Sequence, residues 1–190
     1  MLSHIPMLVR IVLFISFFLL ISCSSKSKVV IDSSHISDVE DDYSEMTTRY
    51  PLYVGDITDK RKDKDSLGTL GLTDVSSNDI LKWLSKAFVS RGYKLNIDDK
   101  KLAEGQETQA CVVDIGLKLA YIRSSSTSKA TNIVLSTYIK QAETSKYYRG
   151  TDTGMNWISS ESEIISSFTL ALKDALDTME SDMPNHCPKN

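Results

Sequence analysis

The chain has 190 residues, with 25 acidic residues against 22 basic ones and a formal net charge of −3 at neutral pH. A chain of this length is typical of a single compact domain. The absence of a basic excess argues against a nucleic-acid-binding protein, because no surplus of positive charge is present to neutralise phosphates. Three scattered cysteines exclude a zinc ribbon and a disulfide-dense scaffold.

The first 22 residues have the pattern of a secretory signal and not of a folded element. The apolar run at 11–21 contains only Ser16 as a polar residue. It is too short for a transmembrane helix, which needs about 20 residues, but has the right length for the hydrophobic region of a signal peptide. The run ends in the sequence Leu-Ile-Ser-Cys at residues 20–23, which resembles the bacterial lipobox.

The lipobox resemblance implies that Cys23 carries lipid. In lipobox proteins the thiol receives a diacylglycerol, the signal is cut before the cysteine, and the new amine is acylated with a palmitate-type chain. Several chains on one residue anchor a protein stably, whereas a single chain is marginal. Ser24 follows in place of Asp, which resembles the outer-membrane default of Gram-negative sorting. The alternative is an ordinary Cys23 behind an uncleaved anchor.

The sequence divides the mature chain into a tether, one domain and a tail. The polar segment 23–48 is expected to be a tether, apart from a short strand at 29–31, because its composition is acidic and poor in apolar residues. The domain is expected at 49–184, and a flexible tail at 185–190.

The first half of the domain predicts a strand, a charged loop and a helix. A strand is expected at 52–58, and the seven charged residues at 59–65 predict a solvated loop because they cannot be buried. The apolar stripe predicts a helix that starts at Ser76 or Ser77, with Asp79 completing a capping box. Gly92 fits a left-handed helix cap, and a short strand follows at 93–97.

The second half predicts a meander and a long helix. Alternation predicts strands at 109–122, 132–142 and 146–153. The first of these strands is expected to bury one face made of Cys111, Val113, Ile115, Leu117, Leu119 and Tyr121. The second is expected to bury Ile133, Leu135, Thr137 and Ile139. The last helix is expected over 160–183, with Ser160 and Glu163 as a capping box and Pro184 at its end.

These elements predict an α+β domain in the order β-α-β-β-β-β-α. We expect a two-layer sandwich in which two amphipathic helices cover one face of a mostly antiparallel sheet. Short polar turns between successive strands are typical of such a sheet.

Several short motifs then fall in one order along nearly the whole chain. They are the lipobox, Asp59-Lys60-Arg61, Leu67-Gly68, Arg91-Gly92-Tyr93, Tyr148-Arg149-Gly150 and a terminal helix that ends near Asp182-Met183. This set resembles the YajG family of Gram-negative lipoproteins, from which the chain departs in its long Lys/Asp run and its two extra cysteines. The resemblance implies the fold, the anchoring and the compartment. It implies no enzymatic activity and no cofactor.

The sequence contains no pattern typical of an enzyme. His35 falls in the tether and His186 in the tail, and neither stands beside a nucleophile motif. His186 and Cys187 are adjacent but have no further ligands at metal spacing. The acidic residues at 38–45 lack the Gly and the terminal Glu of a calcium loop. We therefore expect no catalytic residue, no metal and no cofactor beyond the lipid on Cys23.

Two thiols, Cys111 and Cys187, remain once Cys23 is acylated. An oxidising periplasm permits a disulfide, provided that the two Cα atoms come within about 7 Å. Alternation places Cys111 on the core side of its strand, whereas Cys187 follows Pro184 in the tail. Two alternatives stay open: a bridge that staples the tail to the sheet, or a buried free Cys111.

Four residues are candidates for a partner surface. Asp59 and Arg61 stand in the charged loop, where a hydrogen bond between them could instead fix the end of the strand. Trp83 falls one position off the apolar stripe of its helix, and Trp157 precedes the last helix. An exposed tryptophan pair would indicate a partner groove, whereas a buried pair would lock the helices onto the sheet.

The expected function is non-enzymatic. We expect a lipid-anchored protein of the outer membrane that faces the periplasm and acts as an accessory or binding protein for an envelope or peptidoglycan-related partner, by analogy with other small lipoproteins. The alternative is a carrier of a lipid or muropeptide-type ligand in a groove between the first helix and the sheet. A carrier needs a concave pocket of about 300–1,000 Å³, and an accessory protein needs an exposed patch with a polar rim. A hydrolase is the weakest option.

Overall fold

A computed structural model of the chain describes residues 26–35, 52–95, 111–125, 127–156 and 159–187. The strands are β1 (Lys28–Ile31), β2 (Leu52–Asp59), β3 (Gly68–Leu70), β4 (Thr73–Ser77), β5 (Lys94–Leu95), β6 (Cys111–Ser125), β7 (Ser128–Ile139) and β8 (Thr144–Met155). The helices are α2 (Ile80–Ser90) and α4 (Glu161–Asp182), and a short 3₁₀ turn follows at Met183–Asn185. Within the described residues, no helix has the length and apolar character needed to cross a bilayer.

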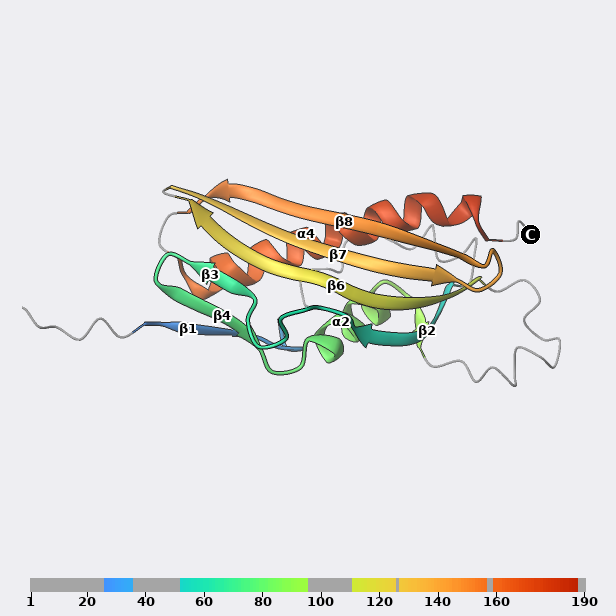
Figure 1. Ribbon diagram of the computed structural model, residues 1–190, viewed down its shortest axis with the longest axis horizontal. Helices are drawn as coiled ribbons and strands as arrows, with labels where there is room; N and C mark the ends of the chain where they lie inside the picture. Colours follow the sequence, from blue (N-terminus) through green and yellow to red (C-terminus); the bar gives the residue numbers. More distant parts are fainter. Residues whose placement is uncertain (1–25, 36–51, 96–110, 126, 157–158, 188–190) are drawn as a thin grey trace, which may run out of the picture.

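The fold is mixed α+β, with one eight-stranded sheet and two helices among the described residues. The sheet order is β1-β4-β3-β6-β2-β5, and β7 and β8 continue it from the other edge of β6. Figure 1 shows the long meander of β6, β7 and β8 with α4 running along it. Both helices contribute to the same buried core.

The sheet contains more parallel pairing than the sequence predicted. β6, β7 and β8 form an antiparallel meander, as the alternation indicated. However, four of the seven pairings between described strands are parallel, namely β1–β4, β2–β5, β2–β6 and β3–β6. The chain between β2 and β6 includes α2, and a crossover of this length lets two parallel strands lie side by side. The strands β3 and β4, of three and five residues, are too short to give an alternation signal.

The strand β1 lies inside the sheet and not in a tether. It pairs in parallel with β4, and its Val29 and Ile31 side chains are buried. The folded part therefore begins about twenty residues before the boundary expected at 49. Two buried apolar side chains and a full partner strand explain the difference, since a local acidic composition does not stop a short apolar stretch from pairing.

The helix α2 begins later than predicted. Ser76 and Ser77 belong to β4, and the N-cap is Asp79, whose side chain accepts a hydrogen bond from the Lys82 amide. The helix is followed by Gly92, whose φ of +82° confirms the expected left-handed position. In α4 the prediction is confirmed at the start, because Ser160 accepts a hydrogen bond from the Glu163 amide at 3.2 Å.

A β-bulge in β6 changes which side chains face the core. The register against β7 shifts between Leu117 and Leu119, so the alternation reverses at that point. Ala120 and Ile122 are buried, whereas Leu119 and Tyr121 are not. The predicted buried face is therefore correct up to Leu117 and wrong beyond it. In β7 the alternation continues without interruption. Ile133, Leu135, Thr137 and Ile139 are all buried, as expected.

A charged cluster joins the end of α2 to the last turns of α4. The Arg91 guanidinium lies 2.8 Å from an Asp177 oxygen and 3.1 Å from Glu180 Oε2, and the Tyr93 hydroxyl donates to Glu180 Oε1 at 3.2 Å. Burial raises the pKa of Glu180, and the neighbouring Arg91 charge opposes that rise. Burial likewise raises the pKa of Tyr93 well above its usual value. The cluster fixes the two helices relative to each other.

Candidate functional site

A pocket opens where two strands share one edge of β6 and leave a gap between them. β2 follows β6 as far as the pair Asp59 and Leu117, and β3 rejoins it at Gly68 and Ile122. Between these points the chain at 60–67 forms a loop, and the gap lies beside the bulge of β6. The pocket has a volume of about 530 Å³. It is lined by Lys60, Arg61, Lys62, Asp63, Ser66, Gly68 and the β6 residues 118–121.

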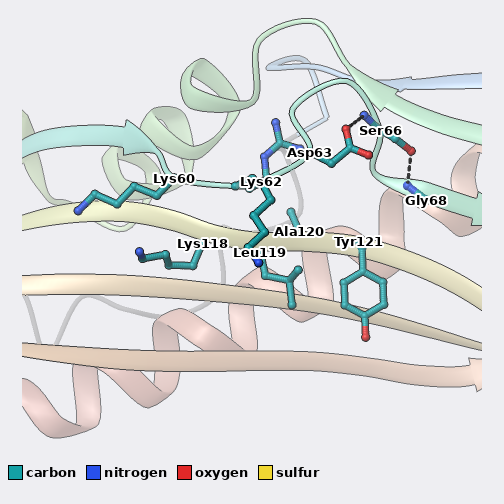
Figure 2. Close-up of a pocket in the computed structure, with 10 residues that line it drawn as sticks. Lys60, Lys62, Asp63, Ser66, Gly68, Lys118, Leu119, Ala120 and Tyr121 are labelled. Atoms are coloured by element: carbon teal, nitrogen blue, oxygen red, sulfur yellow. Dashed lines mark hydrogen bonds between the residues drawn. The ribbon is translucent and has the colours of Figure 1, made fainter.

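The rim of this pocket is positively charged. Figure 2 shows Lys60 and Lys118 close to each other over the sheet, Lys62 reaching from the loop toward Leu119, and the Tyr121 ring at the opposite side. The three lysines are exposed, and none of them has an ion-pair partner among the described residues. In an acidic chain, such a group of unpaired lysines around a hollow is suited to an anionic group.

Asp59 and Arg61 fix the shape of the loop. Two nitrogens of the Arg61 guanidinium donate to the two Asp59 carboxylate oxygens at 3.0 and 2.9 Å, and one also donates to the Lys64 carbonyl at 3.2 Å. The Arg61 side chain is buried, so the expectation that all seven charged residues are solvated is wrong. Burial alone would raise the pKa of Asp59, but its hydrogen bonds and ion pair with Arg61 hold that pKa below its usual value.

Two of the four residues proposed as a partner surface, Arg61 and Trp83, are buried. Arg61 is buried against Asp59, and Trp83 is only 1% exposed within α2. Trp83 points inward because its position follows the buried side of the helix together with Ile80, Leu84 and Ala87. Trp157 lies outside the described residues. The ion pair between Asp59 and Arg61 fixes the loop, and the buried guanidinium is not accessible to a partner.

A second hollow extends the pocket along the same surface of the sheet. It has a volume of about 100 Å³ and shares Lys60 and Lys118 with the first one. Its other lining residues are Ser136, Thr137, Tyr138, Ser145 and Tyr147. Tyr147 is 67% exposed and Tyr138 41% exposed, and their strands β8 and β7 are neighbours. We call the surface formed by these two pockets the lysine–tyrosine face.

Sequence reasoning missed the lysine–tyrosine face. A signal for part of it was present, since alternation places Lys118, Tyr138 and Tyr147 opposite the buried positions of their strands. The hollow itself had no such signal, because it depends on where β2 leaves β6 and where β3 arrives. The groove expected between α2 and the sheet is filled by Trp83, Leu84 and Phe88, each at most 1% exposed.

The two remaining cysteines are joined. Cys111 at the start of β6 and Cys187 after α4 form a disulfide with a Cα–Cα distance of 5.3 Å. Cys187 is buried, and its amide donates to the Met183 carbonyl at 3.0 Å. The tail expected to be flexible at 185–190 is thus ordered as far as this residue, since the disulfide and the 3₁₀ turn both hold it. Residues 188–190 lie outside the described part of the chain.

The histidines lie beside carboxylates. His35 Nδ1 is 3.6 Å from an Asp32 oxygen, and His186 Nε2 is 3.3 Å from an Asp182 oxygen. Across the described ranges, no three residues of the types His, Cys, Asp and Glu gather in the manner of a metal site. Cys23 precedes the described residues, so its lipidation stays a prediction.

Comparison with known proteins finds similar solved structures but no matching family. No family model matches the chain, so the resemblance to the YajG family is not confirmed, and no curated protein matches it. Among solved structures, the chain is similar to a minor lipoprotein from Acinetobacter baumannii, with 10% identity and a TM-score of 0.33 over 74% of this chain and 96% of that one.

Two further structures are similar at the same level. Lipoprotein GNA1162 from Neisseria meningitidis has 10% identity and a TM-score of 0.28, over 72% of this chain and 99% of that one. The PelC dodecamer from Paraburkholderia phytofirmans has 10% identity and a TM-score of 0.33, over 66% and 87%. TM-scores this low do not define a common fold.

Proposed function

We propose that the chain is a lipid-anchored protein of the Gram-negative outer membrane that faces the periplasm and acts by binding, not by catalysis. One observation carries the proposal: an eleven-residue, mostly apolar run ends at Ile21, and Ser22 and Cys23 follow, so that Ile21 and Ser22 are the aliphatic and small residues of a lipobox. A thiol at this place is the acceptor that lipoprotein maturation requires. The fold that follows it begins at β1, within a few residues.

The lysine–tyrosine face is the surface that we propose for binding. It combines lysines that have no ion-pair partner in the described part of the chain with exposed tyrosine rings, which offer both charge and a flat amphipathic contact. An envelope component with carboxylate or phosphate groups fits this chemistry, and peptidoglycan is the polymer of that kind that an outer-membrane accessory protein would meet. This supports the accessory role expected from the sequence.

The carrier function is the second candidate, and one observation favours it. The pocket of about 530 Å³ falls within the usual range for small ligands of about 300–1,000 Å³. It lies at the gap beside β6 and not under α2, so a carried ligand would be bound by the loop at 60–67. A carrier would retain its ligand through purification, whereas an accessory protein would be recovered empty and bound to its partner.

The anchoring is tested with Cys23→Ala. We expect mass spectrometry of the wild-type protein to find a processed chain that starts at Cys23 with a diacylglycerol and an N-acyl chain. The variant should leave the membrane pellet or accumulate as an unprocessed precursor. A wild-type chain with a bare amino terminus, or mature-sized variant that stays in the membrane, would contradict the proposal.

The binding face is tested by charge reversal. Acylated protein in detergent is sedimented with purified peptidoglycan sacculi, and the variant Lys60→Glu/Lys118→Glu should lose at least three-quarters of the pelleted fraction. Lys82→Glu is the matched control, because Lys82 is an exposed lysine on α2, away from both hollows. Equal sedimentation of all three proteins, or none by the wild type, would reject peptidoglycan as the partner.

A further inference from the structure

Several strand ends meet at one end of the sheet, which we call the tip. The register places the start of β1 beside the start of β4, with Lys28 opposite Asp74. β3 ends and β4 starts on either side of the turn at residues 71–72. The β6–β7 turn and the end of β8 lie at the same end, since Ser128 pairs with Met155. Figure 1 shows this end on the left, with β1 entering from it.

Hydrogen bonds join these separate turns into one surface. The Gly71 amide donates to Ser124 Oγ at 3.0 Å, which links the β3–β4 turn to the end of β6. The Asn156 amide donates to the Thr127 carbonyl at 2.7 Å, which links the end of β8 to the β6–β7 turn. The tip is therefore a connected part of the fold, and its side chains have a defined direction.

Two large apolar side chains are exposed on the tip. Leu72 is 70% exposed and Met155 is 59% exposed. The exposed charges at this end are mixed, with Lys26, Lys28 and Arg123 against Asp74 and Glu161. Single exposed apolar residues are ordinary on a protein surface, so the meaning of these two depends on what the tip faces.

The chain before the tip is short. The Ser27 and Thr73 hydroxyls hydrogen-bond to each other at 2.6 Å, and the Asp74 amide donates to the Ser27 carbonyl at 3.0 Å. Ser27 is thus fixed to the residue that follows Leu72. Cys23 precedes Ser27 by four residues, which span at most about 14 Å even when fully extended. The headgroup zone on one side of a bilayer is itself about 5–8 Å thick.

We propose that the tip lies on the bilayer, with Leu72 and Met155 in the headgroup zone of the lipid. The inference rests on the acylation of Cys23 proposed above, and it adds an orientation to that anchoring. Acyl chains on Cys23 hold the amino terminus at the membrane, and four residues cannot carry the tip far from it. The side chains that then face the lipid include the exposed Leu72 and Met155. The far end of the sheet, with Tyr147, points away from the membrane.

The proposal is tested by fluorescence quenching in vesicles of phosphatidylcholine with brominated acyl chains. All proteins are acylated and carry Trp157→Phe, so the background is Trp83, which is 1% exposed and lies in the core. Leu72→Trp reports on the tip. Tyr147→Trp is the matched control, because it is also exposed and stands eight residues, or about 26 Å, from Met155 along β8.

We expect the emission of Leu72→Trp to fall at least twofold relative to vesicles without bromine, and the emission of Tyr147→Trp to change little. Met155→Trp is the second reporter and should also be quenched. Equal quenching at both ends, or none at the tip in protein that floats with the vesicles, overturns the orientation and leaves the anchoring intact. A blue-shifted but unquenched Leu72→Trp means that a second copy or another protein covers the tip, which also overturns it.

Failure of the anchoring has a different signature. Protein that does not float with the vesicles, and whose mass corresponds to a bare Cys23, overturns the proposed function and the orientation together. Lengthening the segment between Cys23 and Ser27 gives an independent check. A 20-residue Gly/Ser insertion after Ser24 should keep flotation but reduce quenching at Leu72→Trp, because a flexible segment of that length no longer holds the tip at the lipid. Unchanged quenching would contradict the claim that the short segment after Cys23 holds the tip at the lipid.

Discussion

The two ends of the long meander are built differently. At the far end, where β6 begins and α4 finishes, a disulfide joins Cys111 to Cys187, and the buried Arg91 pairs with Glu180. At the tip, the turns are joined by hydrogen bonds between backbone amides and neutral oxygen acceptors. The far end is closed by a disulfide and a buried ion pair. Near the tip, Lys129 pairs with Asp152 and Glu163, while Leu72 and Met155 face the exterior.

This contrast suggests that the far end holds the stronger contacts within the fold, and that contact with lipid is assigned to the tip. Charged hydrogen bonds and disulfides contribute more to folding than neutral hydrogen bonds do. Exposed apolar side chains contribute almost nothing to folding, because they are not removed from water. Substitutions at the far end should therefore lower the free energy of unfolding, and those at exposed positions of the tip should leave it unchanged.

The largest loss is expected from removal of the disulfide. The bond closes a loop with a sequence separation of 76 residues. Loss of that constraint on the unfolded chain lowers the free energy of unfolding by about 4 to 5 kcal/mol. The measurement is urea unfolding of Cys111→Ala/Cys187→Ala against wild type. Reductant should lower the wild-type midpoint toward that of the variant and leave the variant unchanged. Equal midpoints for the two proteins without reductant would show that the disulfide does not stabilise the far end.

The next largest loss is expected at the buried cation of the same end. Arg91→Met leaves Glu180, which is 5% exposed, without its ion-pair partner. Breaking a buried pair on one side costs about 3 kcal/mol or more of unfolding free energy. The double variant Arg91→Met/Glu180→Met is the control, and it should recover part of the loss because no unpaired buried charge remains. A double variant at least as unstable as the single one would mean that packing, not charge, is important here.

The sequence predicted the strands better than it predicted the surface between them. Alternation identified the buried side of β7 correctly, from Ile133 to Ile139, because each side chain there depends only on its own strand. The same rule failed in β6 beyond Leu117, since a bulge adds one residue and reverses the pattern. No local signal in the sequence marks that extra residue.

The candidate site was predictable only in part for a related reason. Asp59 and Arg61 are two residues apart, so their pairing could be anticipated from the sequence itself. The pocket depends on β2 leaving β6 at Leu117 and β3 joining it at Ile122, which are contacts between distant segments. Trp83 falls beside the helix stripe, so the sequence leaves both an exposed and a buried side chain open, and the core around α2 is wide enough to bury that position.

A smaller and pH-dependent loss is expected between the two ends, at Asp59→Asn. The variant removes the carboxylate that accepts two hydrogen bonds from the buried Arg61 guanidinium, which lowers the free energy of unfolding by about 2 kcal/mol at neutral pH. The pKa of Asp59 is lowered in the fold. Its contribution is therefore complete above the ordinary carboxyl pKa of about 4 and is lost as the pH falls below it.

The pH series makes this prediction specific. Urea unfolding is measured from pH 7 to pH 2.5 for wild type and Asp59→Asn, and the gap between the two proteins should close as the pH falls. Asp65→Asn is the control, since Asp65 is an exposed carboxylate in the same loop for which no ion pair is formed among the described residues. A gap that stays constant down to pH 2.5 would show that the loss does not come from the charge of Asp59.

The smallest effect is expected at the tip, where two leucines of one turn provide a matched pair. Leu70 is fully buried and Leu72 is 70% exposed, although only Gly71 separates them. Leu70→Ala should lower the free energy of unfolding by about 2 to 5 kcal/mol, as expected for a core leucine. Leu72→Ala should change it by no more than about 0.5 kcal/mol, since an exposed side chain has few contacts to lose.

Both variants are measured by urea unfolding of the unacylated domain, so that no membrane contact contributes. A loss above about 1 kcal/mol at Leu72 would mean that its side chain packs within the domain, because exposed substitutions rarely cost that much. The contrast between the two ends would then fail at the tip. With Leu72 neutral for folding, its side chain has no role inside the domain and is available for the lipid contact proposed for it.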